Sequence, residues 1–554
     1  RIAGGWVRPG TVSRVHFMMS PLRSDEEIHA EGGAMDAMGP SDEALVDHTG
    51  AGSSYDEVPY RSRAHLDTHP DHLASVARLF GVEAPDPARC RVLEIGCAGG
   101  GNVLPLAVAM PEAAFVGIDL STYQIEEAER DARALGLSNV RFLARDISTV
   151  SEDLGRFDYV ICHGVFSWVP DRVRTAILSL CQRVLNPGGL IYLSLNVLPG
   201  WYLPETIRQL MIFHTAEMPK ADRLRGAQGM LRMVRGLLTD QTYHEVMREE
   251  IDFVLKEEDF YIHHEFLEDT NEPMYFSAFS EKLRSHGFRF LAESRPNKMA
   301  AVAPPEFRAV LESLGDTVER REQYLDFVLN RRFRRSILCR SDVRVSSEPV
   351  LASLTALRFS SRVVPGPTGS DTFQIVGGQR VSTSDPPLQA VLWVLMEALP
   401  RSLSFPDLRV EVERRMEAEA PNEEALRLLI LKAVISGLVD IHVFEPELAR
   451  VVSERPEASP VARRLAETGP VVANLRHRLV HLTELDRAVF PYLDGRNDRS
   501  EILDGVEMAA SKMETPLLGP DGQPATDAEA LRAVLAAAVD KSLRRLLRSA
   551  LLVR

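Results

Sequence analysis

Cysteine is scarce in this chain, and the cysteines that are present lack the spacing of a metal or redox site. Five occur among 554 residues, and none of them forms a C-x-x-C pair: Cys90, Cys97, Cys162, Cys181 and Cys339. An odd number of widely spaced cysteines argues against a disulfide framework and against a structural zinc site. We therefore expect a reducing compartment, which predicts a cytoplasmic protein.

Long hydrophobic runs and an excess of positive charge are also missing. The most apolar stretch, residues 426–444, contains Arg427, Lys432 and Asp440, so it predicts a buried helix and strand and no membrane span. No secretory signal is visible. The formal net charge of −15 argues against binding to nucleic acid or to an anionic membrane. It suits a basic substrate, such as a lysine-bearing protein or peptide.

The length predicts three or four domains. Residues 1–54 are rich in Gly, Ser, Asp and Met without a sustained period, which indicates disorder. Because residue 1 is arginine, we expect Met35 or Met38 to be the natural start. The rest divides into an α/β domain, a helical region with return strands, and two small winged-helix-like units, with expected ranges 55–202, 203–340, 341–450 and 451–554.

Strands and helices alternate in the α/β domain. The pattern predicts a first strand ending at Glu94, with further strands at 115–118, 140–143, 157–162 and 190–195, and helices at 75–80, 102–110, 122–135 and 171–185. This alternation predicts a parallel, Rossmann-like sheet whose ligand lies at the carboxyl edge of the strands. Beyond it we expect helices within 203–257 and at 276–285, a strand at 288–292, and a helix at 317–338. The arginines within 331–335 would then form a solvated face of that last helix.

A glycine-rich turn follows the first strand. Glycine has no Cβ and tolerates positive φ, so such a turn lets the backbone approach a nucleoside-type ligand closely. Asp119 ends the next strand at the spacing from which a carboxylate reaches ribose hydroxyls. The candidate cofactor residues on this turn are Glu94, Gly96, Cys97, Ala98, Gly100, Gly101 and Asn102.

The turn alone also fits a G-x-A-x-x-G dinucleotide pattern, so the cofactor must be decided by other residues. Three features favour S-adenosylmethionine over NAD. Glu94 can answer the ammonium of a methionine moiety, Asp146 after the third strand can accept a hydrogen bond from an adenine amino group, and residues 184–192 read as a helix, a Pro-Gly-Gly turn and an apolar strand.

In this order, the motifs of residues 90–200 resemble those of class I methyltransferases. The resemblance implies that Asp119 holds the ribose, that Asp146 and Ile147 hold the adenine, and that His163 lies near the cofactor. It extends the candidate cofactor residues to Leu120 and Gln124. Ala98 stands where this family commonly has its middle glycine, which is a small steric intrusion.

A closer resemblance covers most of 55–340. The chain is similar to bacterial methyltransferases that carry a methyltransferase regulatory domain, a group that includes protein-lysine methyltransferases of outer-membrane proteins. This resemblance implies a homodimer formed through the helices after Trp201. The motifs that carry it are Tyr55-Asp-Glu-Val-Pro-Tyr60, Thr68-His69-Pro70, residues 97–102, Asn196-Val-Leu-Pro-Gly-Trp201, His264-Glu265-Phe-Leu-Glu268, Asn271-Glu-Pro273 and Asn330-Arg-Arg-Phe-Arg-Arg335.

Aromatic residues near these motifs suggest a pocket for the acceptor. A lysine nucleophile must lose its proton first, and burial near aromatic rings lowers the pKa of an amine. Tyr55, Tyr60, Trp168 and Trp201 are the candidates for that pocket, and His163 or His69 is the candidate base.

Other interpretations remain open from the sequence. The acceptor could be a small molecule or a peptide natural product, since residues 493–495 faintly resemble leader-peptide-binding modules. Alternatively, two winged-helix units could bind DNA with a cofactor-sensing domain attached, although the acidic balance argues against it. His263-His264-Glu265 invites a metal site, but adjacent histidines on a strand point to opposite faces, so we predict no metal.

Overall fold

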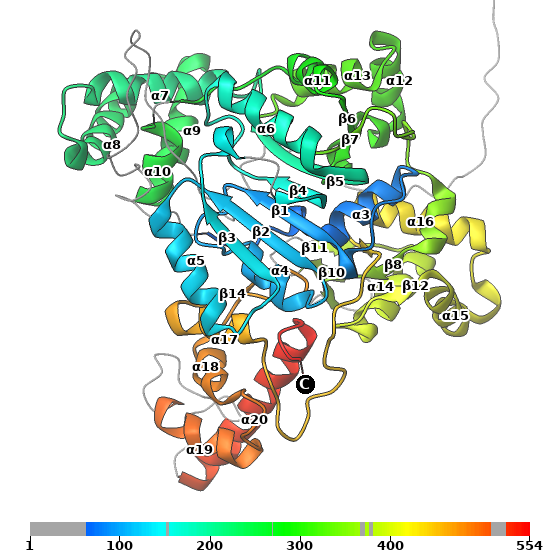
Figure 1. Ribbon diagram of the computed structural model, residues 1–554. Coiled ribbons are helices and arrows are strands. Elements are labelled where there is room, and N and C mark those ends of the chain that lie inside the picture. The colour runs from blue at the N-terminus through cyan, green and yellow to red at the C-terminus, as the bar shows by residue number, and fades with distance from the viewer. Residues whose placement is uncertain are drawn as a thin grey trace, which may run out of the picture.

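A central sheet of seven strands organises residues 91–340 of the computed structural model (Figure 1). Its strand order is β3-β2-β1-β4-β5-β7-β6. The structure describes residues 62–150, 154–268, 270–365, 372–375, 380–510 and 528–553. The expected disordered segment 1–54 and the candidate pocket residues Tyr55 and Tyr60 lie outside these ranges.

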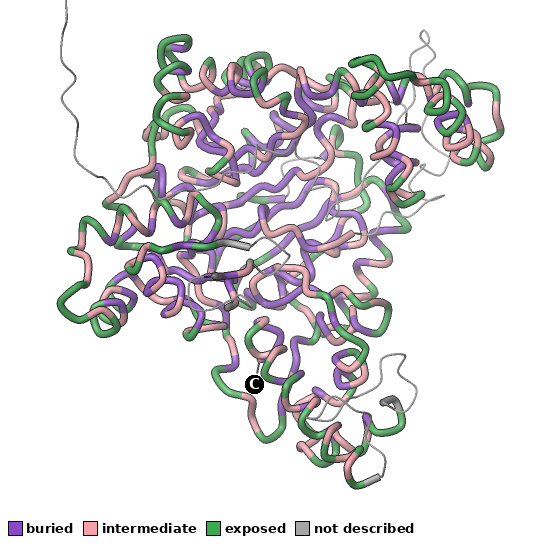
Figure 2. Tube along the Cα trace, turned by 180° about the vertical axis from the view of Figure 1, so that it is seen from behind, coloured by how far each residue is buried: buried purple, intermediate pink, exposed green. Residues whose placement is uncertain are grey.

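Strands β1 to β4 and β6 follow the sequence pattern closely, whereas β5 begins before its predicted range and β7 lies where a helix was predicted. The strands of the sheet are β1 (Arg91–Ile95), β2 (Ala114–Asp119), β3 (Val140–Ala144), β4 (Phe157–Cys162), β5 (Leu185–Asn196), β6 (Phe288–Glu293) and β7 (Phe333–Arg340). Consecutive residues of β1 and β4 are buried, so both faces of the sheet are covered (Figure 2). The helices between the first five strands are α4 (Val103–Ala109), α5 (Thr122–Ala134) and α6 (Asp171–Val184), and α3 (Pro70–Leu79) precedes them.

The first five strands are parallel, and β7 is antiparallel to both of its neighbours. The carboxyl ends of β1 to β4 therefore meet along one edge, where the candidate cofactor residues stand. A dinucleotide-binding sheet would continue past its fifth strand with a parallel sixth strand. The antiparallel β7 inserted between β5 and β6 separates this sheet from that fold.

The Pro-Gly-Gly segment is part of a strand, which corrects the expected turn. Residues 187–189 lie inside β5, which begins directly after α6. The pairing of β4 with β5 jumps from Phe157–Leu185 to Tyr159–Leu190, so the extra residues form an irregularity in the ladder. Gly188 has a φ of 76°, which lets the backbone make this excursion without strain.

Four helices inserted after β5 form a separate unit. They are α7 (Tyr202–Thr215), α8 (Lys220–Leu237), α9 (Thr242–Lys256) and α10 (Asp259–Phe266). They share a small core that includes Met211, Leu231 and Ile251. The unit projects from the body on the side away from residues 341–450 (Figure 1).

The arginines at 331–335 do not form an exposed helix face, so that expectation is wrong. Helix α13 (Val318–Leu329) is capped by Asn330, whose φ of 47° is left-handed, and Arg334 and Arg335 lie in β7, which begins at Phe333. Arg334 is fully buried, and its guanidinium donates to Glu293 at 2.7 Å, to Glu322 at 2.9 Å and to Asp326 at 2.8 Å. Three carboxylates from β6 and α13 make this burial of charge tolerable.

Residues 341–450 form a unit whose core is continuous with that of the large sheet. Strand β8 (Arg358–Ser360) pairs with β12 (Leu403–Ser404) and β13 (Asp440–His442), while β9 (Val363–Pro365), β10 (Thr372–Ile375) and β11 (Arg380–Ser382) form a second small sheet. The helices are α14 (Pro386–Ala398), α15 (Phe405–Met416) and α16 (Glu423–Ile435). Leu79 of α3 and Phe359 of β8 belong to one hydrophobic cluster.

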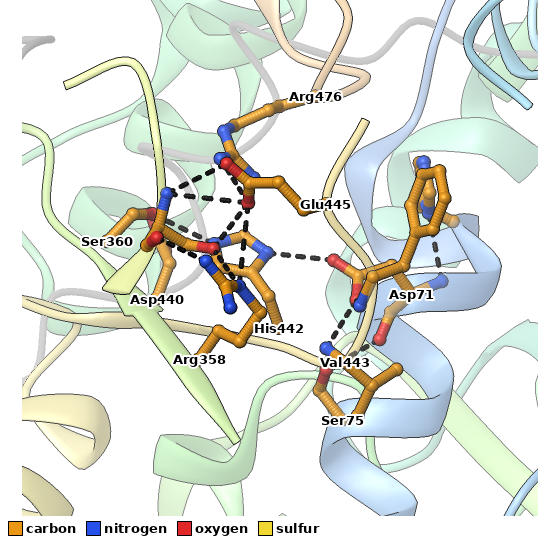
Figure 3. A network of polar contacts seen from close by, with 12 residues as sticks. Asp71, Ser75, Arg358, Ser360, Asp440, His442, Val443, Glu445 and Arg476 are labelled. Carbon is orange, nitrogen blue, oxygen red and sulfur yellow. Dashed lines mark hydrogen bonds and ion pairs between the residues drawn. The ribbon is translucent and has the colours of Figure 1, made fainter. Parts of the chain in front are cut away.

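A buried carboxylate on α3 joins the two units. Asp71 accepts hydrogen bonds from the backbone N–H groups of Val443 and Phe444 at 2.6 and 2.7 Å, and it contacts His442 Nδ1 at 2.8 Å (Figure 3). His442 Nε2 lies 2.8 Å from Ser360 Oγ. Burial alone would raise the pKa of Asp71, but its attraction to His442 and these hydrogen bonds hold it at about 2. Although the order Ser-His-Asp matches a hydrolase triad, Ser360 is buried within β8, so we interpret the network as a domain junction.

The C-terminal unit has its own hydrophobic core. It contains α17 (Pro460–Thr468), the hairpin of β14 (Val471–Ala473) and β15 (Leu479–His481), and helices α18 (Glu484–Val489), α19 (Arg499–Ala510) and α20 (Ala528–Arg548). The strand expected at 549–553 is reduced to a single bridge between Ala458 and Leu552. None of the helices in the described ranges is both long and apolar enough to cross a bilayer.

Candidate functional site

The turn after β1 is built from residues with left-handed backbone. Gly96, Ala98 and Gly100 have φ values of 74°, 45° and 77°. The backbone N–H of Ala98 donates to Asp119 Oδ2 at 2.9 Å, so the end of β2 holds the turn in place. Ala98 thus adopts a conformation that favours glycine, which is a backbone cost that the sequence alone did not reveal.

Two glycines of the turn are required by contacts within the protein. A Cβ on Gly96 would overlap the side chain of Val165, and a Cβ on Gly101 would overlap the backbone of Ser62. The Gly101 N–H also donates to Ser62 Oγ at 2.8 Å. The segment before α3 therefore lies directly against the turn, a contact that the glycine pattern did not predict.

Asn102 connects the turn to the carboxylate of β1. Its side chain is buried, and its Nδ2 donates to Glu94 Oε1 at 2.9 Å and to Thr68 Oγ1 at 3.0 Å. Its Oδ1 accepts from the backbone N–H of His65 at 2.9 Å and lies 2.7 Å from His477 Nε2. Thr68 belonged to a motif noted in the sequence, whereas no sequence signal pointed to His477.

Glu94 is a buried carboxyl group at the turn, and its pKa is shifted. It is 4% exposed, and burial raises its pKa to about 8, with Asn102 opposing and Asp119 adding to the shift. Its Oε2 is buried without a hydrogen-bond partner. A ligand cation placed there would satisfy this oxygen and favour the ionised form, which fits the ammonium of a methionine moiety.

The residues after β2 provide a second part of the cradle. Asp119 Oδ1 accepts the Ser121 N–H at 2.9 Å, so backbone bonds orient its carboxylate at the strand end. An ionised carboxylate offers about four acceptor positions, so these bonds are compatible with ribose binding. Gln124 is buried with Nε2 lacking a partner, and Leu120 is exposed at the rim. Two buried polar atoms without partners, Glu94 Oε2 and Gln124 Nε2, thus fit a polar nucleoside ligand.

The residues expected at the adenine follow β3 at the same sheet edge. Asp146 is exposed, and its Oδ1 accepts hydrogen bonds from Ser148 N and Oγ at 2.8 and 2.7 Å. This bond caps the short helix Ile147–Thr149, in which Ile147 is half-buried. Cys97 is buried, and burial raises the pKa of its thiol well above the usual value, which leaves it a packing residue of the turn.

His163 follows β4 and lies in a cluster of rings. Its Nδ1 is 3.2 Å from the hydroxyl of Tyr192, and its ring centroid is 4.2 Å from that of His65 and 6.4 Å from that of Phe333. Burial lowers the pKa of His163 to about 4, with Arg335 adding to the effect. The ring is therefore neutral near pH 7 and can accept a proton.

The two tryptophans contact each other. Their ring centroids are 6.2 Å apart in an edge-to-face arrangement. Trp201 is buried and precedes α7, whereas Trp168 is half-buried. Trp168 is therefore the better pocket candidate, and Trp201 supports it by packing. His69 caps α3 by accepting the Asp71 N–H on Nδ1, and burial lowers its pKa to about 4.

The adjacent histidines at 263 and 264 lie on a helix, so the strand geometry used against a metal site is wrong. His263 and His264 belong to α10, and their ring nitrogens and a Glu268 carboxylate oxygen lie within 4.8 Å of one another. Residues one apart on a helix are separated by about 100°, so neighbouring donors can converge there. The prediction that the protein holds no metal remains a prediction.

Comparison with known proteins supports an S-adenosylmethionine site at the turn after β1. A family model of a methyltransferase domain matches residues 92–189, a model of a predicted methyltransferase regulatory domain matches 258–340, and a model of the C-terminal winged helix domain of PKMT matches 454–551. The sheet, the glycine turn and these matches define a class I S-adenosylmethionine-dependent methyltransferase. This assignment confirms the expected cofactor class over the dinucleotide alternative.

Similar proteins cover nearly the whole chain. A protein of Rickettsia prowazekii, RP789, is 33% identical over 534 residues, which are 92% of this chain and 96% of that one. The structure of PKMT2 from Rickettsia typhi, a protein-lysine methyltransferase, covers 89% of this chain and all of its own at 25% identity and a TM-score of 0.79. PKMT2 in complex with AdoHcy covers 90% of this chain and all of its own, at 26% identity and a TM-score of 0.78. The chain belongs to this family of methyltransferases with a regulatory domain and a C-terminal winged helix.

Proposed function

We propose that the protein transfers a methyl group to the side-chain amine of a lysine in a protein or peptide substrate. The observation that carries the proposal is the similarity to PKMT2 over 89% of the chain, with a winged helix of the PKMT type at the C-terminus. The net charge of −15 supports a basic substrate. The expected cofactor residues along the edge of β1, β2 and β3 would hold the donor.

Some residues of the site would hold the methyl donor, and others would take the proton from the lysine amine. Bound S-adenosylmethionine supplies an electrophilic methyl group on a sulfonium. Glu94 would bind the ammonium and Asp119 the ribose, which fixes the donor for in-line attack, and such alignment contributes roughly 7–11 kcal/mol. The lysine nitrogen forms the new N–C bond as the S–C bond breaks, and the electron pair of that bond stays on sulfur.

His163 is our candidate for taking up the lysine proton. Its ring is neutral near pH 7 because burial lowers its pKa to about 4, and its hydrogen bond with Tyr192 fixes the ring plane. A pKa this low makes the ring a weak base, so the transfer requires that the pocket also lower the pKa of the lysine amine. The half-buried Trp168 offers an aromatic face that attracts the ammonium before deprotonation. Tyr55 and Tyr60 remain candidates for the same pocket from outside the described residues.

We further propose that two chains associate through the helical insert. Large apolar side chains stand exposed on these helices, and Phe213 on α7 and Leu237 on α8 are the most exposed, at 83% and 77%. Several exposed large apolar side chains on one helical unit favour a protein interface there. Sedimentation of Phe213→Glu and of the wild type checks this, with a monomer expected for the variant. A wild type that sediments as a monomer contradicts it.

We place the reaction in the cytoplasm. All five cysteines are free and buried, which supports a reducing compartment. The proposed cytoplasmic location and the proposed dimer do not depend on which group accepts the methyl.

The acceptor is tested with a labelled methyl donor. The purified protein is incubated with methyl-labelled S-adenosylmethionine and proteins of its source organism, and labelled bands are hydrolysed to amino acids. Methyl-lysine is the expected product, and His163→Ala is expected to lower its rate by about 10²–10⁴-fold if His163 acts as the base. The matched control His481→Ala changes an exposed histidine of β15 and keeps the wild-type rate. Label only in the small-molecule fraction would refute the protein acceptor.

A further inference from the structure

The tip of the β14–β15 hairpin inserts into the body of the protein. Leu475 belongs to the main hydrophobic core and not to the core of the C-terminal unit. Arg476 Nη2 donates to Glu445 at 2.9 Å (Figure 3) and to the carbonyl of Pro400 at 2.9 Å. Arg478 pairs with Asp440 at 2.9 Å. The residues on either side of His477 thus anchor the hairpin on the unit formed by residues 341–450.

The hairpin tip is a built turn that presents His477. Asn474 Oδ1 accepts the backbone N–H groups of Arg476 and Arg478 at 3.0 and 2.8 Å, and Asn474 Nδ2 donates to Ser549 O at 2.7 Å. His477 has a φ of 59°, a left-handed conformation that costs about 1 kcal/mol or more for a residue with a side chain. Such a backbone conformation persists only where the surrounding contacts hold it in place.

His477 contacts the cofactor turn directly. Its ring is 1% exposed and its Nε2 lies 2.7 Å from Asn102 Oδ1. The orientation of the Asn102 amide is fixed, because the backbone N–H of His65 can only donate and must therefore face Oδ1. His477 Nε2 is consequently the donor, and the ring is in the Nε2–H form. Its Nδ1 is buried without a hydrogen-bond partner.

Asn102 has no spare hydrogen-bonding position. His65 and His477 donate to Oδ1, while Glu94 and Thr68 accept both protons of Nδ2. The Thr68 hydroxyl also lies 3.2 Å from Oδ1, but it is closer to the carbonyl of His65, at 2.8 Å, which takes its proton. If the buried Asn102 Oδ1 loses one of its donors, the protein no longer compensates fully for removing that oxygen from water, which costs free energy. Loss of His477 would therefore free the Asn102 amide to tilt, and the Glu94 carboxylate that it orients would tilt with it.

We propose that His477 is a positioning residue of the S-adenosylmethionine site, through which the C-terminal winged helix completes the turn that binds the cofactor. The inference rests on the assignment of this turn as the cofactor site. It gives the C-terminal unit a role in cofactor binding in addition to any contact with substrate. By linkage, occupancy of the turn and docking of the hairpin reinforce each other.

The test compares histidine variants by calorimetric titration with S-adenosylmethionine. His477→Ala is expected to bind about three- to tenfold more weakly, which is the effect of losing one hydrogen bond. His477→Gln keeps a donor near the position of Nε2 and is expected to stay within about twofold of the wild type on the same grounds. His481→Ala removes an exposed histidine from β15 of the same hairpin and leaves the affinity unchanged.

Melting temperatures separate positioning from a purely structural role. Wild-type affinity in His477→Ala overturns the proposal. The proposal also fails if the Ala and Gln variants lose affinity equally and in proportion to their drop in melting temperature. If the turn were not the cofactor site, Asp119→Ala would bind S-adenosylmethionine as tightly as the wild type, which distinguishes that failure from this one.

A measurement on the wild type covers the case in which His477→Ala does not fold. Amide hydrogen exchange of residues 471–481 is followed with and without S-adenosylmethionine. Slower exchange in the hairpin on cofactor addition is expected. Unchanged exchange in the hairpin, with protection confined to the turn after β1, overturns the coupling.

Discussion

Replacement of Glu94 by glutamine should make the cofactor-free protein more stable while weakening its affinity for the cofactor. The carboxylate is buried, one of its oxygens has no partner, and burial raises its pKa from 4.5 to about 8. The amide of Glu94→Gln can still accept the hydrogen bond from Asn102 but carries no charge. A charged group that destabilises the cofactor-free protein but binds the cofactor is a common source of conflict between stability and function.

The size of the effect depends on pH, and its sign follows from proton linkage. Below pH 4.5 Glu94 is protonated in both the folded and the unfolded chain. Between pH 4.5 and about 8 only the folded chain keeps the proton, so the free energy of unfolding falls as pH rises. At about 1.4 kcal/mol per pH unit, Glu94→Gln should exceed the wild type by about 2 kcal/mol at pH 6 and by about 4–5 kcal/mol at pH 8.5.

Urea denaturation at these two pH values measures the difference. Glu126→Gln, which changes an exposed carboxylate on α5, is the matched control and should stay within about 0.5 kcal/mol of the wild type. Calorimetry should show S-adenosylmethionine binding weakened at least about tenfold in Glu94→Gln, because a charged hydrogen bond is lost. A variant that is no more stable than the wild type at pH 8.5, or a stability gain that is equal at both pH values, would refute the reasoning.

Three further substitutions test the rest of the framework. Asp119→Ala should abolish measurable cofactor binding in calorimetry while costing only about 1–2 kcal/mol of stability for the lost bonds to the turn, and unchanged affinity would count against the site. Arg334→Leu leaves three carboxylates buried and should lose about 3–5 kcal/mol in chemical denaturation, whereas Arg320→Leu on the exposed face of α13 should lose less than about 0.5. Ala98→Val should lose about 1–2 kcal/mol or more because a β-branched residue tolerates a φ of 45° poorly, and Ala98→Gly should lose nothing.

The sequence predicted the parts of the fold that depend on local pattern. The strands β1 to β4 and the helices between them match their predicted ranges within about two residues, because apolar runs and glycine breaks mark them. The helix predicted at 331–335 is wrong because a run of arginines at helical spacing indicates an exposed helix. The carboxylates of Glu293 and Glu322 pair with the buried Arg334 but lie 41 and 12 residues from it in sequence, so the spacing gave no sign of them.

The candidate site was predicted to the extent that it follows the glycine turn. Glu94 and Asp119 are predicted from their places at strand ends and Asn102 from its place at the start of the next helix, and the structure brings them together. His477 lies 375 residues from Asn102 in sequence and contacts it only because a second unit docks on the sheet. Contacts of this kind depend on how separate units pack, which no local period encodes.

The continuous core between the sheet and residues 341–450 limits how this enzyme can be dissected. Leu79 and Phe80 on the α3 side pack in one cluster with Leu357 and Phe359, and Asp71 accepts backbone protons from the far end of the second unit. A recombinant fragment ending near residue 340 would expose these apolar side chains to water and leave a carboxylate without its donors. The smallest piece that keeps this junction intact therefore runs past residue 444, well beyond the boundary that the matched methyltransferase region suggests.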